Sequence, residues 1–302
     1  MVKEVMKPDL LQRGDKIGIV APSRVIDKTQ MERAYKVFSE WGLEVQDGNN
    51  LYNKSGYFAG TDEQRLSDLQ DMLSDTSMKA IFCARGGFGM TKIIDDLDLS
   101  DFKKNPKWVI GFSDITALHL ALNRLKIESV HGLMPVQFGN KEVGQSIDSL
   151  KKLLFEGKGE VISQEHKLNI EGNVQAELVG GNLSLVVESL GTPTEIDTKG
   201  KILFLEEIDE YLYKIDRMFN QLKRAGKFDH LKGLVIGDFS SMKDTAIPFG
   251  TNIYGLIGKY INGWDIPVAL NVPIGHEDYN LAVPVSRVVK FSVDKDGARI
   301  NF

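Results

Sequence analysis

Residues 105–125 read NPKWVIGFSDITALHLALNRL, and this stretch decides the class of fold. The run WVIGF at 108–112 is short and apolar, which is typical of a buried strand. The residues from Asp114 onward have the spacing of a helix. Ser113 stands at the corner between the two. A strand that leads directly into a helix is the unit from which parallel α/β sheets are built.

The same alternation extends through the N-terminal half of the chain. We predict strands at 16–21, 79–84 and 107–112, and helices at 29–41, 61–73, 90–97 and 114–125. Strands that alternate with helices pair in parallel through right-handed crossovers. We therefore expect an N-terminal α/β domain built on a parallel sheet.

The C-terminal half is more mixed. A predicted helix at 145–155 leads into the polar stretch EGKGEVISQEHKLNIEGNVQ, so we expect domains at 1–160 and 172–302, joined by a linker at 161–171. In the second domain the segment LVGG at 178–181 indicates a glycine turn before a helix from about Leu183. Further strands are expected at 201–206, 234–238 and 267–271, helices at 211–224 and 252–261, and a C-terminal hairpin that turns at Asp296-Gly297.

Composition limits the class of function. The 302 residues carry a net charge of -5, from 37 basic and 42 acidic side chains, without a long run of like charge. This argues against a nucleic-acid surface or a basic membrane patch. No stretch has the apolar core of a secretory signal or approaches the roughly 18 apolar residues of a membrane span. We expect a soluble cytoplasmic protein that binds neither nucleic acid nor membrane.

Polar or glycine-rich clusters follow several of the predicted strands. Ligands of open α/β sheets bind at the carboxyl ends of strands, so we expect these clusters to face one cleft. The five clusters are Arg85–Gly89, Ser113-Asp114, His131-Gly132, Glu206-Glu207 and Gly275–Asp278.

Ser113 has two interpretations. Serine is a favoured helix N-cap, which is the plainer one. A strand-turn-helix corner also lifts a serine out of the sheet and points helix amides at a developing anion, as in a nucleophile elbow. The fifth position of the elbow pattern is Ile115 rather than glycine, so the chain is not an ordinary α/β-hydrolase.

The glycines of RGGFG at 85–89 leave three alternatives open. They match neither common nucleotide-binding pattern, which makes a phosphate cradle a weak hypothesis. They also suit a tight turn without a ligand. Alternatively, the backbone amides of Gly87 and Asp114 form an oxyanion hole, which needs two donors from separate loops.

Two histidines follow strands and compete for the role of general base. His276 lies on a glycine-containing loop, and His131 is its rival. His119 lies in the middle of a predicted helix, where we expect a packed or surface role rather than catalysis. No pair has the spacing of a zinc site, so no metal is implied. Glu206 ends an apolar strand, where a carboxylate needs a partner such as an imidazolium.

Other candidates have plainer interpretations. We expect Glu207, Asp209 and Glu210 to form surface ion pairs. Cys83 is the only cysteine, which excludes an internal disulfide and a cysteine-cluster metal site. It lies inside a predicted strand, so a small buried thiol is a better interpretation than a second nucleophile.

Seven stretches in this order resemble the LD-carboxypeptidases, the serine peptidase family that also contains the microcin C self-immunity peptidases. The resemblance extends from about residue 12 to residue 290. The stretches are YFAGTDEQRLSDL, CARGGFG, IGFSDITAL, VHG, LVGGNLSL, ILFLEE and VPIGHEDYN. Family members commonly have tyrosine where this chain has Phe88, so any role of that hydroxyl is absent here.

The resemblance implies a fold and an activity. The expected fold is an N-terminal flavodoxin-like or amidotransferase-like parallel-sheet domain with a C-terminal β-rich swivelling domain. The implied triad is Ser113 as nucleophile, His276 as base and Glu206 as the acid that orients it, with the amides of Gly87 and Asp114 as oxyanion donors. The implied reaction, without a cofactor, releases the terminal D-alanine of murein tetrapeptide during cell-wall recycling.

Three alternatives remain at this point: a microcin-type peptidase that acts on a peptidyl-adenylate, a muropeptide-binding protein without activity, and a nucleotide-binding protein that uses RGGFG. The sequence leaves the oligomeric state open, with a homodimer as one candidate.

Overall fold

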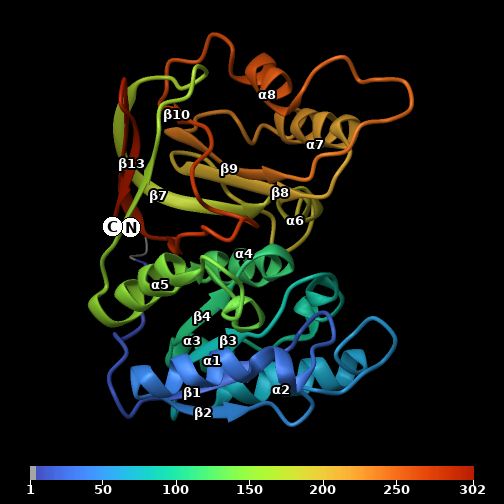
Figure 1. Ribbon diagram of the computed structural model, residues 1–302, viewed down its shortest axis with the longest axis vertical. Helices are drawn as coiled ribbons and strands as arrows, with labels where there is room; N and C mark the ends of the chain where they lie inside the picture. The colour runs from blue at the N-terminus through green and yellow to red at the C-terminus, as the bar shows by residue number, and fades with distance from the viewer. Residues whose placement is uncertain (1–4) are drawn as a thin grey trace.

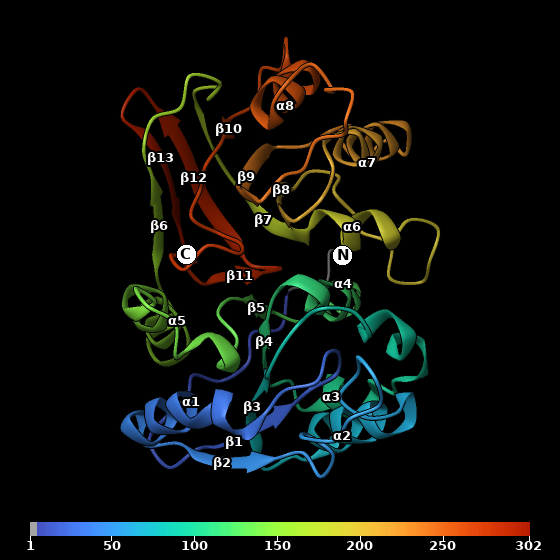
Figure 2. The same cartoon turned by 45° about the vertical axis from the view of Figure 1, so that its right-hand side comes forward.

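Two sheets organise the chain, one in each lobe of the computed structural model, which describes residues 5–302 (Figure 1). The protein is a two-domain α/β protein, as the sequence predicts. Figure 2 shows that α4 and β11 lie between the lobes. No helix in the described part of the chain is long and apolar enough to cross a membrane.

The N-terminal lobe contains a six-stranded, mostly parallel sheet. Its strand order is β11-β5-β4-β3-β1-β2, and only β11 runs antiparallel to its neighbour. This confirms the parallel sheet. The strands are β1 (Lys16–Val20), β2 (Glu44–Asp47), β3 (Met78–Cys83), β4 (Trp108–Gly111), β5 (Ser129–His131) and β11 (Val283–Val285).

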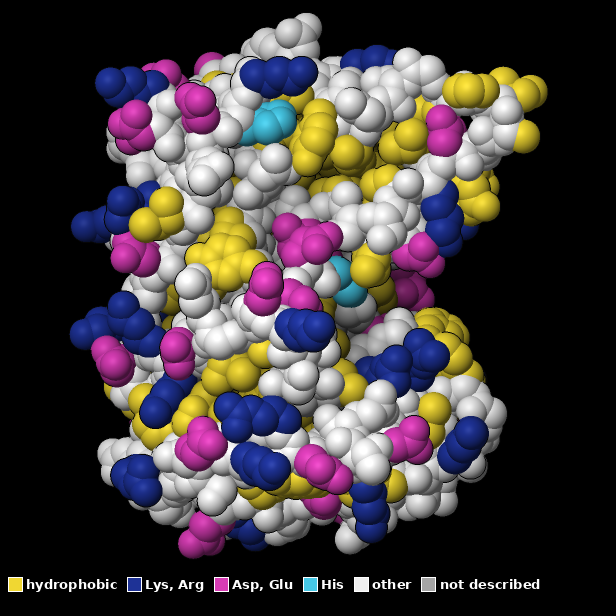
Figure 3. All heavy atoms as spheres, viewed as in Figure 1, with side chains coloured by type: hydrophobic (Ala, Val, Ile, Leu, Met, Phe, Trp, Pro, Cys, Tyr) yellow, Lys and Arg dark blue, Asp and Glu magenta, His cyan; other side chains and the backbone are white. Residues whose placement is uncertain are grey.

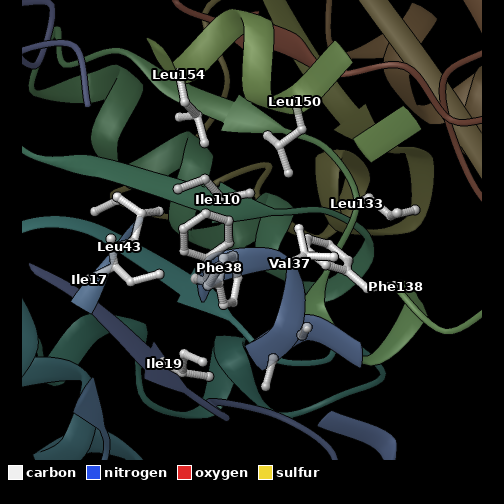
Figure 4. Packing of buried hydrophobic residues seen from close by; sticks show 14 of the residues in the cluster. Ile17, Ile19, Val37, Phe38, Leu43, Ile110, Leu133, Phe138, Leu150 and Leu154 are labelled. Carbon is white, nitrogen blue, oxygen red and sulfur yellow. The ribbon is translucent and has the colours of Figure 1, made fainter. Parts of the chain in front are cut away.

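Helices cover both faces of this sheet and confirm the helical periodicity. They are α1 (Lys28–Trp41), α2 (Asp62–Ser74), α3 (Ser100–Lys104), α4 (Thr116–Arg124) and α5 (Gly144–Glu156). One apolar cluster packs α1 and α5 on the sheet, and a second packs α2 and α4 on the opposite face. Figure 4 shows the first cluster, with Phe38 of α1, Ile110 of β4 and Leu150 of α5 close together.

The C-terminal lobe contains a mixed seven-stranded sheet of order β10-β9-β8-β7-β12-β13-β6. The strands β7 to β10 are parallel, and the others pair antiparallel. The strands are β6 (Glu160–Ser163), β7 (Gly172–Asn182), β8 (Ile202–Ile208), β9 (Gly233–Ser240), β10 (Val268–Ala269), β12 (Val288–Asp294) and β13 (Gly297–Asn301). The helices are α6 (Leu183–Glu188), α7 (Leu212–Arg224) and α8 (Ile253–Ile261).

Two local predictions are wrong. The segment LVGG is not a turn but the end of β7, where Gly180 and Gly181 have φ of +134° and +142°. A Cβ on Gly180 would collide with the carbonyl of Phe204, so the glycines permit close approach between strands rather than chain reversal. Residues 90–97 form two short 3-10 turns, η1 (Met90–Lys92) and η2 (Ile94–Asp96), instead of one helix.

The sequence pattern does not indicate where two strands pair. The strand β6 lies at the edge of the C-terminal sheet, beside β13, whereas β11 returns from the C-terminal half to pair with β5 in the N-terminal sheet. The linker at 161–171 stays a prediction, and its first residues belong to β6.

Candidate active site

Ser113 occupies a strained corner directly after β4. Its φ of +61° lies in the left-handed region, which non-glycine residues rarely adopt and which is frequent at functional sites. It is the first residue of the 3-10 turn η3 (Ser113–Ile115), which continues into α4. The cap position belongs to Phe112, and no side chain caps this turn. The expected N-cap role of Ser113 is therefore wrong, because the serine already lies inside the turn.

The glycines of RGGFG pack directly against this corner. A Cβ added to Gly86 would lie 3.1 Å from the Cβ and 3.3 Å from the Oγ of Ser113. Gly87 has a φ of +114°, which favours glycine strongly. The glycine pair thus allows the loop backbone to run beside the serine hydroxyl. Whether the Gly87 and Asp114 amides bind an oxyanion stays a prediction.

The carboxylate of Asp114 joins three loops at this point. Its side chain is buried, and Oδ2 accepts hydrogen bonds from Ser23 Oγ at 2.5 Å and from the backbone amide of Met90 at 2.8 Å. Burial raises the pKa of this carboxyl to about 6, although both hydrogen bonds oppose the rise. Sequence reasoning considered only the amide of Asp114. Its side-chain role was missed because the partners lie 91 and 24 residues away.

His276 and Glu206 form a hydrogen-bonded pair in the C-terminal lobe. His276 Nδ1 lies 2.6 Å from Glu206 Oε2, and Glu206 is completely buried within β8, two residues before the strand ends. Burial by itself would lower the pKa of His276, but the Glu206 carboxylate outweighs it through charge and hydrogen bonding, so the pKa is raised. The imidazolium form is thus favoured by a buried counter-charge.

Phe112 connects this pair with the serine corner. Its ring meets the His276 imidazole edge-on, with centroids 4.8 Å apart, and Ser113 is the next residue. No hydrogen bond involves Ser113 Oγ among the described residues. In serine hydrolases the contact between nucleophile and base is often long in the free enzyme and tightens when substrate binds. The two lobes therefore contribute the serine and the imidazole to one place.

Glycines allow the His276 loop to approach the end of the sheet. Gly275 has a φ of +145°, and a Cβ there would lie 2.9 Å from the Cβ of Asp238 and 3.2 Å from that of Glu206. Ser146 on α5 fixes the far end of the loop, because its Oγ donates to the Asp278 carbonyl and accepts from the Asn280 amide, each at 3.0 Å. The N-terminal lobe thus holds the loop that carries His276.

The competing residues lie in the core. His131 is fully buried between the rings of Phe112 and Phe204, with centroids 5.5 Å and 5.1 Å away, and burial lowers its pKa. His119 packs within α4, as expected, and burial lowers its pKa to about 4. Cys83 is a buried thiol, also as expected, and burial raises its pKa. None of these side chains is exposed to a substrate.

The acids that follow Glu206 have different surroundings. Glu207 is buried and accepts hydrogen bonds from Ser184 and Asn182, so the expected surface ion pair is wrong for this residue. Asp209 and Glu210 do form ion pairs, with Lys243 at 2.6 Å and Lys214 at 3.1 Å. Glu206 and Glu207 have different partners because successive side chains of a strand point to opposite faces of the sheet.

The junction between the lobes is the place where these groups meet. Figure 3 shows the surface hollowed between the lobes on its right-hand side, with a histidine and acidic side chains on the upper wall. The fold and site together define a two-domain α/β protein that brings a strained serine, an imidazole and a buried carboxylate together at the ends of its strands.

Comparison with known proteins identifies the family. The LD-carboxypeptidase N-terminal domain model matches residues 17–132, and the LD-carboxypeptidase C-terminal domain model matches residues 175–291. The chain is 38% identical over 284 residues to a probable murein peptide carboxypeptidase of Bacillus subtilis (strain 168), which covers 92% of this chain and 89% of that protein. This protein belongs to the LD-carboxypeptidase family.

Solved structures agree with this assignment. The crystal structure of muramoyltetrapeptide carboxypeptidase from Oxalobacter formigenes is similar, with a TM-score of 0.87 at 26% identity, covering 95% of this chain and 98% of that one. The structure of MccF in complex with glutamyl sulfamoyl guanosine has a TM-score of 0.85 at 21% identity, covering 98% of each chain. The second likeness shows a shared fold alone.

Proposed function

We propose that this protein is a serine-type LD-carboxypeptidase that releases the terminal D-alanine from murein tetrapeptide during cell-wall recycling in the cytoplasm. The observation that carries the proposal is the hydrogen bond between buried Glu206 and His276, placed beside the strained corner at Ser113. The names of the relatives support the substrate class, because they are described as murein peptide and muramoyltetrapeptide carboxypeptidases.

In the acylation step, Ser113 Oγ attacks the scissile carbonyl carbon while His276 Nε2 takes the hydroxyl proton. Glu206 accepts the hydrogen bond from Nδ1, which selects the required tautomer and stabilises the imidazolium. The amides of Gly87 and Asp114 bind the oxyanion that forms. The carbon–nitrogen bond then breaks, and His276 returns the proton to the amine of the leaving D-alanine.

Deacylation follows the same pathway with water. His276 takes a proton from a water molecule, whose oxygen attacks the ester carbon that is bonded to Ser113 Oγ. The carbon–Oγ bond breaks, the proton returns to Oγ, and the shortened peptide leaves as a free acid. Every proton thus passes through the single imidazole that Glu206 orients.

A substrate panel tests this function. The purified protein is incubated with a murein tetrapeptide, with an adenylated peptide and with a nucleotide, and products are measured by mass spectrometry and binding by thermal shift. We expect loss of one D-alanine from the tetrapeptide, and Ser113→Ala is the control. Cleavage of the adenylated peptide alone would favour a microcin-type activity. Binding of the tetrapeptide without cleavage would favour a muropeptide-binding protein, and a shift with the nucleotide alone a nucleotide-binding protein.

A further inference from the structure

Two arginines lie at the RGGFG loop, and neither forms an ion pair with a carboxylate among residues 5–302. Arg85 begins the loop, and Arg24 lies on the segment between β1 and α1, where its backbone amide is 3.4 Å from the Gly86 carbonyl. In the described part of the chain, four other arginines do form such ion pairs. Arg85 donates one hydrogen bond, from Nη1 to the Val25 carbonyl at 3.3 Å, out of its five donors.

These like charges lie close enough to affect each other. Burial lowers the pKa of Arg85, and the charge of Arg24 lowers it further. The Arg24 guanidinium lies over the Tyr57 ring, 5.2 Å from its centroid, and the side chains of both residues flank Gly87. The charge of Asp27 opposes this lowering only in part, because the pKa of Arg85 stays lowered. Two neighbouring guanidinium groups repel each other, and an anionic ligand would relieve that repulsion.

The two arginines lie where the terminal carboxylate of a carboxypeptidase substrate is expected. The terminal carboxylate follows the scissile carbonyl by one residue, so the two groups lie within about 3.8 Å, one Cα spacing. The carbonyl must sit at Ser113 Oγ, and that atom packs against Gly86, which follows Arg85 and whose carbonyl faces the Arg24 amide. Near His276 the charge is negative instead: Asp238 acts on the imidazole, Glu277 is the next residue, and both would repel a carboxylate.

From this geometry we propose that Arg24 and Arg85 form the subsite that binds the terminal carboxylate of the leaving D-amino acid. The inference rests on the proposed function and explains why the enzyme would remove only a terminal residue. Paired guanidinium groups present several donors in fixed planes, which suits a carboxylate better than a neutral amide end.

The test compares two substrates that differ only at this end: a murein tetrapeptide with a free terminal carboxylate and the same peptide as its C-terminal carboxamide. The enzymes are wild type, Arg24→Ala, Arg85→Ala and the control Arg33→Ala, which removes an exposed arginine of α1 that pairs with Glu40. We measure kcat/KM for each combination and check the fold of each variant by its melting temperature.

Wild type and Arg33→Ala should prefer the free acid by about 100-fold, as expected when one partner of a close charge pair is removed. Each subsite variant should lose activity mainly on the free acid, so that its preference falls toward unity. A preference that survives in either variant, or an equal loss on both substrates, overturns the subsite.

The outcome also separates this inference from the proposed function. A wild-type enzyme that cleaves both peptides equally well refutes the subsite and leaves the carboxypeptidase activity in place. A wild-type enzyme that releases neither D-alanine from the free acid nor D-alaninamide from the carboxamide refutes the proposed function, and the subsite with it.

Discussion

Glu206 and Glu207 are neighbours on β8, but their carboxylates serve opposite faces of the sheet. Glu206 bonds to His276, whereas Glu207 bonds to Ser184 and Asn182 at the start of α6. The apolar residues that precede them alternate in the same way. Ile202 and Phe204 belong to one core cluster, and Leu203 and Leu205 belong to the other.

This arrangement predicts different consequences for the two conservative substitutions. Glu206→Gln should lower kcat by about 10² to 10⁴-fold, because the imidazolium loses its counter-charge while the shape of the side chain is kept. Glu207→Gln should mainly lower the melting temperature, because its carboxylate holds the start of α6. Steady-state kinetics on one tetrapeptide, together with thermal melting, distinguishes the variants. If Glu206→Gln keeps wild-type activity and Glu207→Gln is inactive, then Glu207 and not Glu206 supports His276.

Removal of the Ser113 hydroxyl should lower kcat by several orders of magnitude. Stability should hardly change in Ser113→Ala, since no side chain caps this turn. Ser113→Gly should be just as inactive but more stable than Ser113→Ala by about 1 kcal/mol, because glycine tolerates the φ of +61°. Activity assays and thermal melting check both statements. Retention of a tenth of wild-type activity in either variant is incompatible with a serine nucleophile.

The proposed reaction also predicts stereospecificity. The enzyme should release D-alanine from an L,D amide bond and should cleave an L,L peptide of the same composition only slowly. This expectation rests on the family to which the chain belongs. Mass spectrometry of the two isomers under identical conditions measures the ratio. Equal rates would indicate a general peptidase instead.

The His276–Glu206 pair predicts a pH profile. The base must be neutral to accept a proton, so kcat/KM should rise with pH through the His276 pKa, which lies above the ordinary 6.5. Glu206→Gln should move this limb to lower pH, because burial still lowers the pKa of His276 and its strongest opposing charge is gone. The same pair stabilises the fold below pH 6.5, and that contribution is lost as pH rises through the folded-state pKa. If the limb stays at the same pH in Glu206→Gln, Glu206 is not the cause of the raised His276 pKa.

Asp114 should act as a positioning residue through Ser23 and Met90. Asp114→Ala removes the acceptor that joins the three loops, so we expect kcat to fall by about 10²-fold, the usual cost of small misplacement, with little change in KM. Asp114→Asn keeps one acceptor oxygen and should retain more activity. Kinetics of the two variants on one tetrapeptide checks the order. Wild-type activity in the alanine variant would show that the hydrogen bonds are dispensable.

Local periodicity determined much of the fold. The alternation of strands and helices in the first half predicts the parallel sheet. The alternation of apolar residues at 202–205 places Glu206 and Glu207 on opposite faces of the strand. These features depend on residues that are close together in the sequence. The spacing of apolar residues shows which face of a helix or strand is buried.

Tertiary structure decided the rest, because the partners are distant in sequence. The left-handed φ of Ser113, the three loops joined by Asp114 and the return of β11 to the first sheet have no local pattern. The glycines of LVGG suggest a turn, because the sequence does not distinguish a glycine that permits close approach of two strands from one that permits chain reversal. Sequence by itself placed the chemical groups at strand ends, whereas packing between two lobes brought the His276 ring beside the corner at Ser113.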